Sequence, residues 1–260
     1  MSEQTEICSI CCGSGWAPAE IAGTVRRCSC RDAFRLERLF ADARIPKRYE
    51  HCNLDNYKPN DKKEDKEETQ QRAKVLVGEV LDHYPFVTGI LFLGPCGVGK
   101  THLAVAFLKQ VIERFGDSGL FYDFRDLLRD IQSSWNAVSR TSEMDVLRPV
   151  LDARVLVLDE LGANKPTEWV MDTVAHIINC RYNDNKITVF TSNFLDKPEK
   201  PGEYSLTDRV GARLRSRLYE MCRDIEIKGE DYRQKAGKKK NQLGRINRQE
   251  TYVSGLSRPK

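Results

Sequence analysis

The sequence predicts an α/β protein in which a parallel sheet is flanked by helices, with a small cysteine-bearing module in front of it. Apolar strand-like runs alternate with helical patterns from about residue 65 to 234, as a parallel sheet with crossover helices requires. A glycine-rich turn directly follows the first of these runs. Five of the nine cysteines lie in the first 30 residues, and four of them form two close pairs. These three observations define the fold class.

Length and composition fit one medium-sized domain with a small attachment. The chain has 260 residues, of which 40% are hydrophobic and 31% charged, and its net charge of +4 is modest. No run of about 18 apolar residues is present, so we expect no membrane partner. The start, MSEQTEICSICC, lacks the basic and apolar segments of a secretory signal. We therefore expect a cytoplasmic protein, in which the nine cysteines stay reduced and serve some purpose other than disulfides.

The chain divides into four predicted segments. Residues 1–34 form the cysteine-bearing module, 35–64 a linker and lead-in segment, 65–234 the core domain, and 235–260 a basic flexible tail. The tail has no hydrophobic periodicity, and it carries eight Lys or Arg against one acidic residue, Glu250. Such a tail could contact phosphates or could simply keep the protein soluble.

Hydrophobic periodicity predicts the elements in order. The segment RDAFRLERLFADARI is helix-like, and the charge run 61–68 predicts an exposed helix start or a loop. Within the core domain, helices are expected over about 99 to 115, over 167–182 and through GARLRSRLYEM. The run RVLVLDEL is continuously apolar, as a buried parallel strand requires. The expected strands are GILFL, LFYDF, RVLVLDEL, KITVFTSN and CRDIEIKG.

The turn after GILFL carries a phosphate-binding pattern. Residues 94–101 read GPCGVGKT and match G-x-x-x-x-G-K-[ST] between a predicted strand and a predicted helix. The glycines let backbone N–H groups surround phosphate oxygens at the positive end of the helix. We expect Lys100 to reach the β- and γ-phosphates and Thr101 to place its hydroxyl on Mg²⁺. The predicted ATP-binding residues of this loop are Gly94, Pro95, Cys96, Gly97, Val98, Gly99, Lys100 and Thr101.

Polar residues at the ends of two further strands predict the chemistry of hydrolysis. Asp159 ends the third strand and is placed to hold Mg²⁺ through water. Glu160 follows it and can take a proton from an attacking water, because it is not consumed as a metal ligand. Asn193 ends the next strand and could orient that water or bond the γ-phosphate, although such an Asn is otherwise an ordinary turn residue. The sequence therefore predicts an ATP-hydrolysing site.

The early cysteines have the spacing of a structural zinc site. Two close pairs, Cys-x2-Cys and Cys-x-Cys, are separated by 16 residues. One pair on each turn suits tetrahedral Zn²⁺, and four protein ligands leave no open coordination position. Gly13 and Gly15 would let backbone N–H groups approach the sulfurs, and Cys12 is an alternative ligand. Residues 1–34 are therefore predicted as a zinc-binding module, with Cys8, Cys11, Cys28 and Cys30 as ligands.

The segment from Gly211 to Arg233 holds five arginines. If it is a helix, Arg213 and Arg217 lie four residues apart, beside a stripe of apolar residues that can face a core. Most helical arginines lie on a solvated flank, which is the simplest explanation of this pattern.

The motifs GPCGVGKT, VLVLDELG, TSN and the arginine-bearing helix followed by GEDYR resemble those of the AAA+ ATPases of the DnaC/DnaI helicase-loader and IstB-like group. The resemblance covers about residues 44 to 234 and implies an AAA+ P-loop ATPase domain. It implies that ATP binds between subunits, and that Arg217 is an arginine finger that completes the site of the neighbouring subunit. Arg213 is the second candidate for that role, and a structural salt bridge is a third possibility. Arg233 matches a second sensor arginine, which contacts the nucleotide of its own subunit.

The resemblance also implies a function: an ATP-dependent loader that binds a replicative hexameric helicase and assembles on single-stranded DNA as a ring or spiral. ATP binding would hold the assembly together, and hydrolysis would release it. Loaders of the DnaI kind carry an N-terminal zinc module, which implies a docking domain for the helicase. Trp135 and Trp169 would face the central channel and stack on unpaired bases, unless both simply pack.

Three other functions remain open on the sequence. An IstB-like transposition helper ATPase would remodel duplex target DNA, and the zinc module favours the loader over it. A small-molecule P-loop kinase would need a lid and an acceptor pocket, and it would leave Arg217 and Arg233 unexplained. A non-enzymatic zinc adaptor would keep the nucleotide site only as a switch, and Glu160 argues against it.

Overall fold

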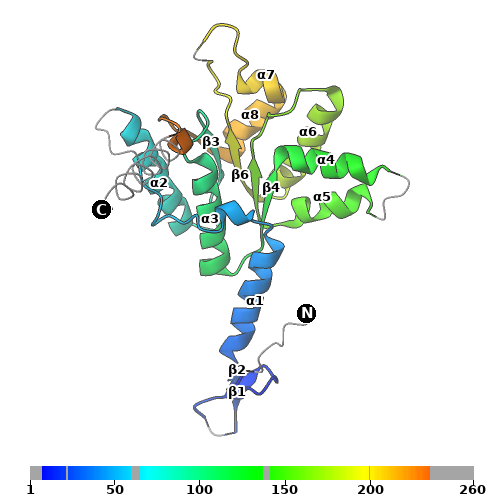
Figure 1. The fold of residues 1–260 in the computed structure, drawn as a ribbon. Helices are drawn as coiled ribbons and strands as arrows, with labels where there is room; N and C mark the ends of the chain where they lie inside the picture. The colour runs from blue at the N-terminus through cyan, green and yellow to red at the C-terminus, as the bar shows by residue number, and fades with distance from the viewer. Residues whose placement is uncertain (1–7, 22, 60–64, 137–140, 199, 235–260) are drawn as a thin grey trace, which may run out of the picture.

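The computed structural model describes residues 8–21, 23–59, 65–136, 141–198 and 200–234 (Figure 1). The predicted tail 235–260 and the first seven residues of the predicted module lie outside these ranges. In the described part of the chain, a two-stranded hairpin and a long helix precede an α/β core domain. No helix in the described ranges is long and apolar enough to cross a membrane.

The core domain is built on a five-stranded sheet whose neighbouring strands all run parallel, in the order β4-β5-β6-β3-β7. All five predicted strand segments are confirmed. The three middle strands are buried along their whole length, as their continuous apolar runs require. The strands are β3 (Gly89–Leu93), β4 (Gly119–Asp123), β5 (Val155–Asp159), β6 (Ile187–Ser192) and β7 (Cys222–Glu226).

Helices cover both faces of this sheet, and alternate strand residues point to each face. On β3, for example, Ile90 and Phe92 belong to one core, whereas Leu91 and Leu93 belong to the other. The first core packs under α2 (Asp65–Asp82) and α3 (Lys100–Phe115). The second packs under α4 (Phe124–Ser134), α5 (Glu143–Asp152), α6 (Glu168–Asn183), α7 (Leu206–Val210) and α8 (Ala212–Met221).

Side-chain caps begin most helices on the second face. The carboxylate of Asp123 accepts hydrogen bonds from two backbone N–H groups at the start of α4, and Thr167 caps α6. Ser142 and Ser205 form capping boxes with acids three residues later, at the starts of α5 and α7. The hydrophobic pattern did not predict α5, although the Ser-x-x-Asp pattern in its first turn signals it.

Two buried arginines hold the second face together. Arg181 of α6 is 1% exposed and has no carboxylate partner among the described residues; it donates instead to backbone carbonyls that include Val150 and Ile187. Burial lowers its pKa to about 9. Arg215 of α8 is 2% exposed and pairs with Asp196 and Asp224. Each guanidinium therefore joins segments that are distant in sequence.

The N-terminal module stands at the far end of α1 (Ser29–Asp42), away from the core domain (Figure 1). The module contains the antiparallel hairpin of β1 (Trp16–Pro18) and β2 (Val25–Arg27). The helix α1 runs continuously across residue 34, where the predicted module ends. After it, the lead-in segment with the short helix η1 (Lys47–Tyr49) crosses from the edge strand β4 toward α3.

Candidate functional site

The phosphate loop joins β3 to α3 at the carboxyl edge of the sheet. Gly97 and Gly99 have φ values of 78° and 99°, a backbone region that favours glycine. A Cβ at Gly94 would collide with the carbonyl of Ile227, and a Cβ at Gly97 would collide with the carboxylate of Asp231. No side chain caps the start of α3, so its first N–H groups can receive a phosphate.

Lys100 is 6% exposed and lies inside this loop. Its Nζ donates to the carbonyl oxygens of Gly94 and Pro95, both at 2.7 Å, and to Oδ1 of Asn193 at 2.8 Å. Burial lowers the pKa of its ammonium group to about 8. The fold thus brings Asn193, which follows β6, to the side chain that is expected to meet the phosphates.

Asp159 joins the phosphate loop to β6. Its Oδ1 accepts hydrogen bonds from Thr101 Oγ1 at 2.8 Å and from Thr191 Oγ1 at 2.6 Å. The carboxyl group is 1% exposed, and burial raises its pKa. A hydroxyl beside a carboxylate is the donor set that Mg²⁺ takes in such sites, so Thr101 and Asp159 fit the ion. Thr191 positions this carboxylate, and the sequence did not assign it that role.

Glu160 follows Asp159 in the left-handed backbone region, with φ of 59°. This conformation is uncommon outside glycine, and the Glu160 N–H donates to Thr191 Oγ1 at 3.0 Å, which holds it there. The Glu160 carboxylate is turned toward α4, where its Oε2 lies 3.0 Å from Nη2 of Arg125. Arg125 is a site residue that the sequence did not reveal, because an exposed arginine in a first helical turn carries no motif.

We predict that Arg125→Ala raises ATP turnover by up to about fivefold, provided that Glu160 is the base. Loss of the ion pair frees the Glu160 carboxylate to approach a water, and a partly exposed pair of this kind contributes up to about 1 kcal/mol. Steady-state turnover without DNA measures the effect. Arg129→Ala is the matched control, since Arg129 lies one turn further along α4 and pairs with Asp126. Lower turnover in Arg125→Ala than in the control would mean that Arg125 assists Glu160 instead.

The segment after β7 packs directly on the phosphate loop. The N–H of Ile227 donates to the carbonyl of Leu93, and the N–H of Tyr232 donates to that of Gly97 at 3.1 Å. Arg233 is exposed at the end of this segment, and its charge contributes to lowering the pKa of Lys100. The structure therefore brings Arg233 into the electrostatic neighbourhood of the phosphate loop of its own subunit.

The arginines of α8 differ sharply in their surroundings. Arg215 is buried in its two ion pairs, with Nε 2.7 Å from Oδ1 of Asp196. Arg213 is exposed and Arg217 is half-buried, and neither side chain forms a hydrogen bond or ion pair with any other described residue. Arg217 lies in the middle of α8, on the sheet face opposite α3. Arg215 thus makes the ion pairs of this helix, and the side chains of Arg213 and Arg217 make none with the described residues.

The two tryptophans predicted to contact DNA lie together. Trp135 ends α4 and Trp169 lies in the first turn of α6, with ring centroids 5.2 Å apart and an interplanar angle of 78°. Trp135 is 54% exposed and its indole N–H donates to Glu143, whereas Trp169 packs against the second core. Trp135 therefore has a ring available for stacking.

The four predicted zinc ligands converge at the base of the hairpin. Sγ atoms of Cys8, Cys11, Cys28 and Cys30 all lie within 4.8 Å of one another. The Cys8–Cys28 and Cys11–Cys30 sulfurs are 3.8 and 3.5 Å apart, close to the spacing around tetrahedral Zn²⁺ with bonds of about 2.3 Å. Backbone hydrogen bonds from Gly15 and Gly13 lower the pKa of Cys11 to about 7. The four thiols therefore fit a zinc ion, and the exposed Cys12 lies outside the cluster.

Comparison with known proteins places this site in context. The family of IstB-like ATP binding proteins matches residues 26–240. The chain is 32% identical over 167 residues to an ATP-binding protein of insertion sequence IS21 from Pseudomonas aeruginosa, an alignment that covers 64% of this chain and 58% of that protein. It is 25% identical to the replicative helicase loader DnaC of Buchnera aphidicola, over 70% of this chain and 71% of the relative.

A solved structure extends this likeness to three dimensions. The crystal structure of the DnaC helicase loader has a TM-score of 0.60 and 34% identity to this chain, over 70% of this chain and 100% of that one. The matches confirm the predicted AAA+ fold class and the predicted resemblance to the loader and IstB-like group. The aligned part of the chain spans less than two thirds of the insertion-sequence relative.

Proposed function

Because the chain belongs to the family of IstB-like ATP-binding proteins, we propose that it is an ATP-dependent loader of a replicative hexameric helicase. The observation that carries this proposal is the cluster of four cysteines in front of an AAA+ core. The resemblance to loaders of the DnaI kind assigns such a module to helicase docking. The long α1 holds the module away from the core domain, where a partner can reach it.

Each site residue has its own role in ATP hydrolysis. Lys100 exchanges its carbonyl contacts for phosphate oxygens, and Glu160 takes a proton from the attacking water while Asn193 orients it. Thr101 and Asp159 would hold Mg²⁺, which would supply positive charge to the phosphates. Arg233 contacts the nucleotide of its own subunit.

Assembly completes the site. The Arg217 side chain has no partner among the described residues of its own subunit and lies away from α3, so we propose that it reaches the ATP of the neighbouring subunit. Subunits would then associate in a ring or spiral when ATP is bound. Trp135, with Trp169 behind it, would stack on single-stranded DNA in the channel, and hydrolysis would release the assembly.

A transposition helper is the second candidate, and the 32% identity to the insertion-sequence protein favours it. Such an ATPase would act on duplex target DNA and would need no helicase.

Capture on an immobilised replicative helicase from the same host separates the two. We expect the full-length chain to bind the helicase with a non-hydrolysable ATP analogue and to leave it when ATP is hydrolysed. Oligo-dT should stimulate ATP turnover of the wild type but not of Trp135→Ala. Absence of helicase capture together with ATP-dependent binding of duplex DNA would overturn the loader and favour the transposition helper.

A further inference from the structure

The functions proposed above assign no role to one face of the N-terminal hairpin. In the ladder, Trp16 pairs with Arg27, and Pro18 pairs with Val25. Residues that pair directly, and residues two apart on one strand, point to the same side of a hairpin. The intervening Ala17 is 3% exposed and packs with Cys11 and Cys28, so its side faces the cysteine cluster. The other four residues therefore face away from the cluster.

This outer surface combines an aromatic ring with unpaired cations. Trp16 is 47% exposed. Arg31, in the first turn of α1, holds its guanidinium carbon 5.6 Å from the Trp16 ring centroid. Its side chain lies over Gly15, where a Cβ would come within 2.9 Å of the Arg31 Cδ. Within the described ranges, neither Arg27 nor Arg31 forms an ion pair with a carboxylate. We call Trp16, Pro18, Val25, Arg27 and Arg31 the hairpin face.

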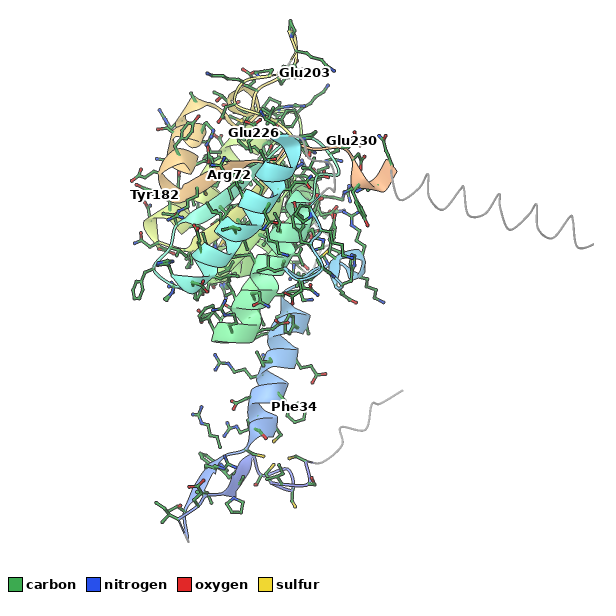
Figure 2. All side chains as sticks on the ribbon, turned by 90° about the vertical axis from the view of Figure 1, so that its left-hand side faces the viewer. Phe34, Arg72, Tyr182, Glu203, Glu226 and Glu230 are labelled. Atoms are coloured by element: carbon green, nitrogen blue, oxygen red, sulfur yellow. The ribbon has the colours of Figure 1, made fainter. Side chains whose placement is uncertain are left out.

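The core domain does not cover the hairpin face. Figure 2 shows the module at the far end of α1, with Phe34 projecting from the exposed helix between the module and the core domain. The helix reaches the core domain through Arg35, whose Nη2 donates to the carbonyl of Gly116, and through Leu36, Leu39 and Phe40. The face is thus open to a ligand that extends beyond the core domain.

We propose that the hairpin face is a second binding site for single-stranded DNA. An exposed indole can stack on a base of any identity, and guanidinium groups form charge-assisted hydrogen bonds with phosphate. The Cβ atoms of directly paired residues lie about 4.5–5.5 Å apart, so Trp16 and Arg27 can hold the base and the phosphate of one nucleotide. Arg31 would take a neighbouring phosphate and stack beside the same ring.

The chemistry of the face favours DNA over a protein partner. A protein-docking patch also uses aromatic residues and Arg, but it gains its affinity from a contiguous apolar centre. Here the Arg31 guanidinium lies over the indole, and Arg27 stands opposite Trp16 on the neighbouring strand. That arrangement matches a ligand in which flat rings alternate with anions. The inference rests on the proposed action on DNA, and it adds a contact that does not depend on ATP.

Fluorescence anisotropy with labelled oligo-dT and full-length, nucleotide-free protein tests the inference over a range of salt concentrations. Trp16→Ala should weaken binding by about fivefold to a hundredfold, the range for one stacked base. Arg27→Ala with Arg31→Ala should weaken binding and reduce the slope of log K against log salt by about 1.4, because two phosphate contacts are lost. Arg26→Ala is the matched control: it removes the same charge from the same strand on the opposite side, and should change affinity by less than about twofold. Zinc content and circular dichroism verify that each variant is folded.

Five outcomes would overturn the inference. The first is that Arg27→Ala with Arg31→Ala binds DNA with the same affinity and the same salt slope as the wild type. The second is an equal loss in Arg26→Ala, which would indicate net charge rather than a defined face. The third is unchanged DNA binding with lost helicase capture, which would make the face a protein-docking surface. If Trp135→Ala loses DNA binding and Trp16→Ala does not, the hairpin face is not a DNA-binding site, but the proposed DNA contact at Trp135 stands. No DNA binding by the wild type would overturn the proposed action on single-stranded DNA as well.

Discussion

Glu160→Gln is expected to lower ATP turnover by about 10²–10⁴-fold while ATP binding persists, because the amide cannot accept a proton from water. Glu160 is suited to this role by its position. The neighbouring Asp159 takes the hydrogen bonds of Thr101 and Thr191, whereas the Glu160 carboxylate stays outside that set and pairs with Arg125. Steady-state turnover and equilibrium binding of a fluorescent ATP analogue separate catalysis from binding.

The matched control for this variant is Glu168→Gln, the same substitution at an exposed acid in the first turn of α6. It should leave turnover within about twofold of wild type, as exposed surface changes usually do. If Glu160→Gln keeps wild-type turnover, Glu160 is not the base. If wild type itself shows no turnover, the adaptor hypothesis replaces the ATPase.

Arg217→Ala is expected to lower turnover by about 10³–10⁵-fold, the range for loss of an arginine finger. The half-buried guanidinium has no partner among the described residues, and α8 lies on the sheet face opposite α3, so the proposal is that Arg217 contacts the ATP of a neighbour. Turnover of the wild type should therefore rise more steeply than protein concentration.

Mixing two inactive variants gives the sharpest form of this test. A subunit with Arg217→Ala keeps an intact phosphate loop, and a neighbour with Lys100→Ala can supply Arg217 to it, so activity should partly return in the mixture. Arg213→Ala is the control, four residues earlier on the same helix and exposed. Activity that is lost in Arg213→Ala and kept in Arg217→Ala would move the finger to Arg213. Turnover proportional to concentration, with a silent Arg217→Ala, would overturn the shared site.

The sequence alone determined the parallel sheet, the phosphate loop and the four converging cysteines. Each depends on a pattern that is short along the chain: GILFL before GPCGVGKT, RVLVLDEL ending in Asp159, and two close cysteine pairs. In such patterns, local backbone geometry places the functional groups almost unaided. The helix α5 was missed because a single capping box is a weak signal beside an apolar strand.

Only the tertiary structure decided which arginines and acids meet. Arg125 reaches Glu160, Arg215 rather than Arg213 or Arg217 joins Asp196 and Asp224, and Tyr232 lies against Gly97. Every one of these contacts joins different elements or loops, most of them far apart in sequence. A guanidinium can be buried only where the fold supplies acceptors that offset its desolvation, and those acceptors carry no motif of their own. The half-buried Arg217 side chain finds no such acceptors among the described residues, which is why the proposed contact with a neighbouring subunit needs the mixing experiment.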